Sequence, residues 1–163
     1  MDDKKIIKIE IISTRYESDE SLFSEQSDGQ DEIIYQKSSD AKPEVTQVKT
    51  EGVLCYSQDR VELFYDETEL CGMEGSHTSI SFDKNQPHII TMIRTGMVSA
   101  TLVFEEGQRH HCVYKTPFMP FEVCVRSIKV KNLFLSCGLI ELDYIVEIRG
   151  ARAERTNLSI RVF

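Results

Sequence analysis

The sequence predicts an all-β fold, a single antiparallel up-and-down β-barrel of about ten strands. From residue 44 onward polar and apolar residues alternate in short runs, and turn residues recur about every ten positions. A strand sends successive side chains to opposite faces, so such alternation is typical of strands with one buried face. No eleven-residue window repeats apolar residues at helical spacing, which argues against helical and βαβ folds.

The predicted strands follow one another closely along the chain. The first covers 6–13, where Ile7, Ile9 and Ile11 share one face. The others are 44–57, 60–67, 77–83, 88–95, 97–105, 109–116, 120–131, 138–149 and 156–163. The connections at 58–59, 95–96 and 106–107 leave about two residues to reverse the chain, so consecutive strands are expected to pair as hairpins. A meander that closes on itself hides its edges.

A change of parity inside the strand at 120–131 predicts a β-bulge. Apolar residues occupy odd positions up to Val125 and even positions from Ile128 onward. One extra residue near Arg126 and Ser127 explains this shift, and a bulge there would bend the strand around a barrel corner.

Residues 16–42 are interpreted as a mobile acidic insertion in a single domain that covers residues 1–163. Positions 16–36 contain no Lys or Arg and are rich in Asp, Glu and Ser. Such a segment buries too little apolar surface to offset the entropy of ordering it. It serves either as a solvated linker or as an acidic docking peptide.

Composition narrows the partners and the compartment. A formal net charge of -8 disfavours nucleic acid and anionic membranes, which are bound through Lys and Arg. The N-terminal apolar stretch is interrupted by charges and has no small-residue cleavage site, so it is not expected to be a signal peptide. No apolar run approaches 18 residues, so no membrane-spanning helix is predicted. Five cysteines, without a CxxC pair, fit reduced thiols better than a disulfide framework. A cytoplasmic protein is therefore expected.

Five short segments, in this order, resemble the YwiB-like bacterial proteins: 50–56, 61–67, 92–96, 114–117 and 138–144. The resemblance implies a closed or nearly closed calycin-like, lipocalin-related barrel of unassigned function. By wider analogy its interior holds a small apolar ligand. Two features depart from the family. Its Tyr-x-Thr segment is usually followed by an aromatic residue and Gly, whereas here Phe118 is followed by Met119 and Pro120, and the insertion at 16–42 is longer than usual.

The ligand-binding hypothesis rests on polar residues in these shared segments. They are Arg94, Tyr114, Thr116, Glu51 and Tyr65. An interior site needs an apolar pocket with a few convergent polar groups. Arg94 is suited to hold a carboxylate, and a tyrosine supplies both an aromatic wall and a hydroxyl. The structural alternative is that Arg94 pairs with a barrel glutamate such as Glu51 while the tyrosines fill the core.

Neither a metal site nor a catalytic site is predicted. In a strand, His110 and Cys112 share a face while His111 points away, so at most two ligands come from this trio. The sequence has no G-x-S-x-G elbow, Walker loop, Rossmann fingerprint or H-E-x-x-H motif. No catalytic residue, metal or cofactor is therefore assigned, and a non-enzymatic role is expected.

Two functional hypotheses follow. The first is a cytoplasmic barrel that binds a small apolar or amphipathic ligand inside, with Arg94 and nearby tyrosines orienting it. The second is an interaction or structural module that works through the acidic loop, or through an outer apolar face with residues such as Ile89, Ile93 and Ile145. Such an outer stripe would also suit a homodimer.

Overall fold

The computed structural model describes residues 3–17, 43–67, 75–148 and 154–163. They form ten strands and one short helix: β1 (Asp3–Glu17), β2 (Glu44–Tyr56), β3 (Arg60–Asp66), β4 (His77–Asp83), β5 (Ile89–Thr95), β6 (Ala100–Glu105), β7 (Arg109–Lys115), β8 (Pro120–Leu133), α1 (Phe134–Cys137), β9 (Leu139–Ile148) and β10 (Glu154–Val162). The predicted all-β fold and its ten strands are confirmed. Residues 18–42 of the proposed acidic insertion lie outside the described residues.

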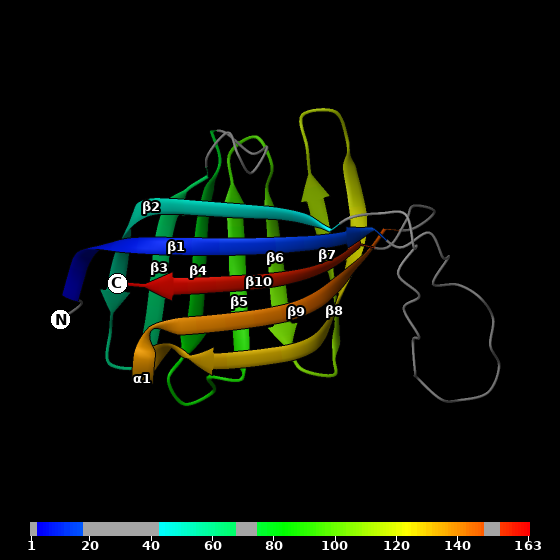
Figure 1. Cartoon of the computed structure of the whole chain (residues 1–163). Coiled ribbons are helices and arrows are strands. Elements are labelled where there is room, and N and C mark those ends of the chain that lie inside the picture. Colours follow the sequence, from blue (N-terminus) through cyan, green and yellow to red (C-terminus); the bar gives the residue numbers. More distant parts are fainter. Residues whose placement is uncertain (1–2, 18–42, 68–74, 149–153) are drawn as a thin grey trace.

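All ten strands belong to one antiparallel sheet with the order β6-β5-β4-β3-β2-β1-β10-β9-β8-β7. The first and last strands pair in the middle of this order, where Ile11 lies opposite Ile160. In Figure 1, β2, β1, β10, β9 and β8 cross in front of β3 to β6, so the sheet folds over on itself. The inward side chains of the two layers form one core, which includes Ile9, Leu63 and Phe104.

The barrel is nearly closed, and its seam lies between β6 and β7. These strands are consecutive in the chain but lie at opposite ends of the strand order. Within the described residues they share one isolated bridge, in which Ser99 and Lys115 exchange backbone hydrogen bonds of 2.9 and 2.8 Å. The chain does turn after Glu105, but the expected hairpin pairing of the flanking strands is wrong.

The bulge in β8 explains why the two strands separate. The register between β8 and β9 shifts between Ser127 and Lys129, so the predicted bulge is confirmed. At this point the backbone of β8 forms hydrogen bonds with the β6–β7 turn. The backbone N–H of Gly107 donates to the carbonyl of Ser127 at 2.9 Å, and the N–H of Ser127 donates to the carbonyl of Gln108 at 3.1 Å.

Helix α1 follows β8 and contributes one aromatic ring to the core. Helix α1, which the sequence analysis missed, is a single turn that ends at Gly138 with a left-handed φ of 71°. It buries Phe134 in an edge-to-face contact with Phe82, with ring centroids 5.9 Å apart. One turn is too short to show apolar periodicity, which is why the sequence pattern did not reveal it.

The outer surface differs from the one expected. Ile145 is only 1% exposed, so its predicted place on an exposed apolar face is wrong. The exposed apolar residues instead include Ile6, Val53 and Phe64, which lie side by side in one cross-strand row of β1, β2 and β3. Among the described residues, no helix is long and apolar enough to cross a membrane.

Candidate functional site

A pocket of about 300 Å³ lies inside the barrel, near the ends of seven strands or the loops that follow them. Its apolar wall comes from both layers of the sheet. Ile11, Val98, Phe121, Val123, Val146 and Leu158 form this wall. Polar side chains complete the lining, namely those of Ser13, Arg15, Tyr65, Glu67, Arg94, Tyr114, Thr116, Tyr144, Glu154 and Thr156. The pocket is thus apolar with convergent polar groups, as ligand sites usually are.

Arg94 enters this pocket because of its place in a cross-strand row. Thr78 of β4 lies opposite Tyr65 on one side and opposite Arg94 on the other, and Ala100 of β6 lies opposite Arg94. The two direct neighbours of Arg94, Thr78 and Ala100, are small and leave room for the guanidinium group. The Arg94 side chain is only 14% exposed.

The charge partner of Arg94 is Glu67, the residue that directly follows β3. The Arg94 Nε lies 3.9 Å from the Glu67 Oε1, and the Glu67 side chain is 4% exposed. The Thr78 hydroxyl donates a 2.6 Å hydrogen bond to the same carboxylate oxygen. At 3.9 Å the two charges attract, but they are too far apart for a hydrogen bond. The buried Arg94 Nε has no hydrogen-bond acceptor among the described residues.

The protonation states of this cluster follow from its burial. Burial alone lowers the pKa of the Arg94 guanidinium, but Tyr144, Tyr114, Tyr65 and Glu67 reverse this effect and raise it, so Arg94 stays charged. Burial raises the pKa of the Tyr114 hydroxyl, although Arg94 opposes the change. Burial likewise raises the pKa of Tyr144 against the effect of Arg94. Both tyrosines are therefore neutral phenols near neutral pH.

Aromatic packing holds these tyrosines in place. Tyr114 of β7 stacks on Phe121 of β8 with ring centroids 5.6 Å apart and an interplanar angle of 8°. Tyr144 of β9 packs against Phe104 of β6 at 4.7 Å and makes a side-chain hydrogen bond with Thr156. Rings anchored in this way form a rigid wall on two sides of the pocket.

A second ion pair completes the charged part of the pocket lining. The Arg15 Nε lies 3.5 Å from the Glu154 Oε1, and these side chains are 39% and 43% exposed. This pair is more accessible than Arg94 with Glu67, so it is weaker and more easily rearranged. With two arginines and two glutamates, the described lining has a formal charge of zero.

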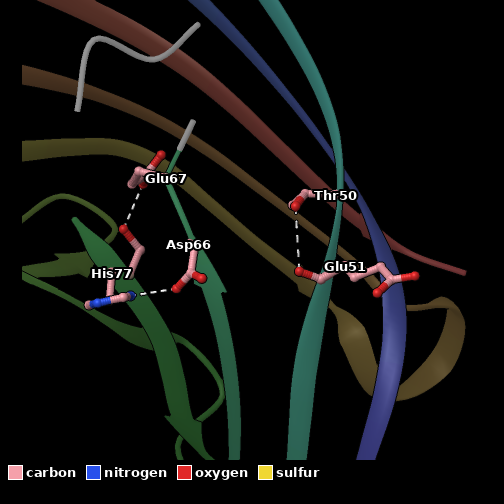
Figure 2. Close-up of polar contacts among 6 residues, drawn as sticks. Thr50, Glu51, Asp66, Glu67 and His77 are labelled. Atoms are coloured by element: carbon pink, nitrogen blue, oxygen red, sulfur yellow. Dashed lines mark hydrogen bonds and ion pairs between the residues drawn. The ribbon is translucent and has the colours of Figure 1, made fainter. Parts of the chain in front are cut away.

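Four of the five predicted site residues, Arg94, Tyr114, Thr116 and Tyr65, meet in this pocket. Glu51 does not join them. It is exposed on the outer face of β2, and Figure 2 shows it directed away from Glu67. The alternative expectation, that Arg94 pairs with a barrel glutamate, is met by Glu67 and not by Glu51, which was its example.

Thr116 lines the pocket, but its hydroxyl is already engaged. It donates to the carbonyl of Met119 at 2.8 Å and accepts from the backbone N–H groups of Phe118 and Met119 at 3.3 and 3.2 Å. This hydroxyl-centred turn connects β7 to β8 without a glycine. Thr116 is thus committed mainly to the turn.

Glu67, Tyr144 and Thr156 were missed as pocket residues. The inward direction of Glu67 could have been predicted, because Glu67 continues the buried odd positions of β3 that include Leu63 and Tyr65. Figure 2 shows the contrast with its neighbours: the exposed side chains of Asp66 and His77 form a hydrogen bond with each other. What the sequence did not give was which inward residues of distant strands meet.

The two histidines and the one cysteine of β7 do not form a metal site with other described residues. No group of three or more His, Cys, Asp or Glu side chains lies together in the described part of the chain. His110 Nε2 contacts Glu105 Oε2 at 3.3 Å. Burial raises the pKa of the Cys112 thiol to about 11, with a smaller contribution from Cys124. The four described cysteines are all free.

The fold and the pocket together define a nearly closed antiparallel β-barrel with a small internal cavity. The chain belongs to the family described as "Domain of unknown function (DUF1934)", whose model matches residues 32–160. The crystal structure of the ywiB protein from Bacillus subtilis is similar, with a TM-score of 0.67 and 17% sequence identity over 97% of this chain and 92% of that one. No curated protein matches the chain. The nearly closed antiparallel barrel expected from the sequence, and its likeness to the YwiB-like proteins, are confirmed.

Proposed function

We propose that this barrel binds one small, partly apolar molecule in its internal pocket, where Arg94 and the tyrosines orient it. One observation carries the proposal: the pocket reaches a buried guanidinium whose Nε has no hydrogen-bond acceptor among the described residues. Buried donors are usually paired, since an unpaired one loses the hydrogen bond it made with water. An oxygen atom of a bound molecule would supply the acceptor.

The size and walls of the pocket support a small ligand. Ligand pockets generally have volumes of about 300–1,000 Å³, and a 150 Å³ cavity is enough to hold benzene. At about 300 Å³, this pocket fits one substituted ring or a short branched chain. Val98, Val146 and Leu158 would contact its apolar part.

We infer a binding role and not a catalytic one. General acid–base catalysis works best with a group whose pKa lies near the working pH. In this pocket the pKa values of Tyr114 and Tyr144 are shifted upward, away from neutrality. The proposed setting is the cytoplasm, where free cysteines such as those described here remain reduced.

Native mass spectrometry of protein purified from its own cells tests the proposal. We expect a small-molecule adduct on the wild type that is absent from the double variant Arg94→Met with Glu67→Gln. This variant removes both buried charges at once and so avoids leaving one unpaired. Arg60→Met is the matched control, because Arg60 is exposed and bonds to Ser81 on the outer face. The control should keep the adduct.

A ligand-observed NMR screen of small aromatic fragments provides the second measurement. Fragments should bind the wild type and the Arg60→Met control, and the double variant should bind them at least about tenfold more weakly, as expected for loss of a charged hydrogen-bond donor. Fragment binding that is unaffected in the double variant would contradict the proposed site.

A further inference from the structure

We infer that the pocket selects an uncharged molecule that carries a hydrogen-bond-accepting oxygen, and that Glu67 sets this selectivity. The inference rests on the proposed function, since it specifies the chemical class of the ligand. It differs from the expectation that Arg94 holds a ligand carboxylate. In the structure a carboxylate is already present, because Glu67 supplies it from within the barrel wall.

The first step is the charge balance of the lining. Arg94 faces Glu67, with both side chains buried, and Arg15 faces Glu154 in a more exposed pair. No other residue of the described lining carries a charge. A ligand carboxylate near Arg94 would therefore bring a second negative charge beside Glu67, where little water screens the repulsion.

The second step is that Glu67 is held in position. Its Oε1 accepts a 2.6 Å hydrogen bond from the Thr78 hydroxyl, and its backbone N–H donates to the carbonyl of Ser76 at 2.9 Å. These bonds come from neighbouring residues of β4 and the turn before it. An incoming anion would have to break the first of them to displace the Glu67 side chain from Arg94.

The third step is the donor that remains. The Arg94 Nε–H lacks an acceptor among the described residues, and the Glu67 oxygen at 3.9 Å is too distant to be one. An uncharged carbonyl, amide or ether oxygen would accept this hydrogen bond and leave the ion pair intact. A cationic ligand would meet the guanidinium instead, and like charges repel at this range.

Benzamide and benzoate test the inference because they match in shape and differ in charge. Their dissociation constants are measured at pH 7 by NMR titration, with the chemical-shift changes mapped onto the pocket. For the wild type we expect benzamide to bind at least about tenfold more tightly than benzoate. Tighter binding of benzoate by the wild type would overturn the inference, and this measurement needs no variant.

Glu67→Gln and Glu67→Asp provide the matched variants. Glutamine keeps an acceptor for the Thr78 hydroxyl but removes the charge, so the order should reverse and benzoate should bind more tightly. Aspartate keeps the charge and should keep the preference for benzamide. If Glu67→Gln folds and leaves the ratio of the benzamide and benzoate dissociation constants unchanged, Glu67 does not set the selectivity.

The outcomes separate the two proposals. Binding of both compounds in the pocket, with the wrong preference, would overturn the selectivity and leave the binding function in place. Failure of both compounds to bind the wild type and both variants, or shift changes confined to the outer surface, would overturn the proposed function and this inference with it.

Discussion

The hydroxyl of Ser127 accepts a hydrogen bond from the backbone N–H of Glu105 at a distance of 3.2 Å. The backbone of the same serine pairs with Gly107 and Gln108 in the following turn. Ser127 is only 1% exposed. One residue of β8 therefore satisfies three backbone groups at the point where β6 and β7 separate.

Ser127→Ala is expected to lower the free energy of unfolding by about 0.5–1.5 kcal/mol, because it removes the side-chain acceptor of the half-buried Glu105 N–H. Urea unfolding followed by circular dichroism measures the loss. Ser136→Ala is the control: its hydroxyl bonds to the carbonyl of Leu133 at an exposed position, so the change should stay within about 0.5 kcal/mol. Equal stabilities of the two variants would mean that Ser127 does not hold the seam.

The strands and the bulge could be predicted from sequence, whereas the seam could not. Alternation in β9 or the parity change after Val125 is a local pattern, because each residue's face depends on its immediate neighbours. The separation of β6 from β7 depends instead on Ser127, about twenty residues further along the chain. The local sequence of a two-residue turn does not indicate that a residue so far along the chain will form hydrogen bonds with the turn backbone.

Arg94→Met alone is expected to destabilise the protein by about 3–5 kcal/mol, because it leaves the buried Glu67 carboxylate without its cation. Adding Glu67→Gln should recover most of this loss. A double-mutant cycle of urea unfolding free energies measures the coupling. If the two changes were simply additive, the 3.9 Å contact between these side chains would carry no stabilising interaction.

The candidate site shows the same division between local pattern and long-range contact. Arg94 shares the parity of the buried Met92, so its inward direction was readable from the sequence. The parity of β2, in which Gly52 and Leu54 are buried, places Glu51 outside. Glu51 and Glu67 both lie in segments that resemble the family, so only strand parity separates them, and parity favours Glu67. Their distances from Arg94 depend on strand register, which no local pattern gives.

Alkaline titration is expected to show late-ionising tyrosines and a matching loss of stability. Folding raises the pKa of Tyr144 chiefly through burial, so the folded state favours the neutral phenol. The neutral Tyr144 phenol therefore contributes to the free energy of unfolding. This contribution is fully present below the unfolded pKa of about 10 and is lost as the pH rises through the folded pKa. Absorbance of tyrosinate against pH measures the ionisation.

Tyr144→Phe is the variant for this titration, since it should remove one late-ionising group. A wild-type titration in which all six tyrosines ionise together near pH 10 in the folded protein would contradict the buried position of Tyr144.

Gly52→Ala is expected to destabilise the barrel by about 1–3 kcal/mol, the usual cost of overpacking a filled core. A Cβ at this position would lie 2.6 Å from the backbone oxygen of Phe64 and would also collide with the side chain of Ile9. The backbone of β3 cannot yield without moving Tyr65, which lies directly opposite Gly52 and lines the pocket.

Gly107→Ala separates this crowding from backbone strain. Gly107 has a positive φ of 77° and nothing within 4 Å of an added Cβ. Gly107→Ala should therefore lower the free energy of unfolding by about 1 kcal/mol, solely because alanine is strained at this positive φ. Urea unfolding compares the two variants, and NMR shifts of Tyr65 report whether β3 moves. Because only Gly52 lies against β3, Gly52→Ala should shift Tyr65 and Gly107→Ala should not. A Gly52→Ala protein with wild-type stability and unshifted Tyr65 would mean that β2 and β3 are less closely packed than this contact requires.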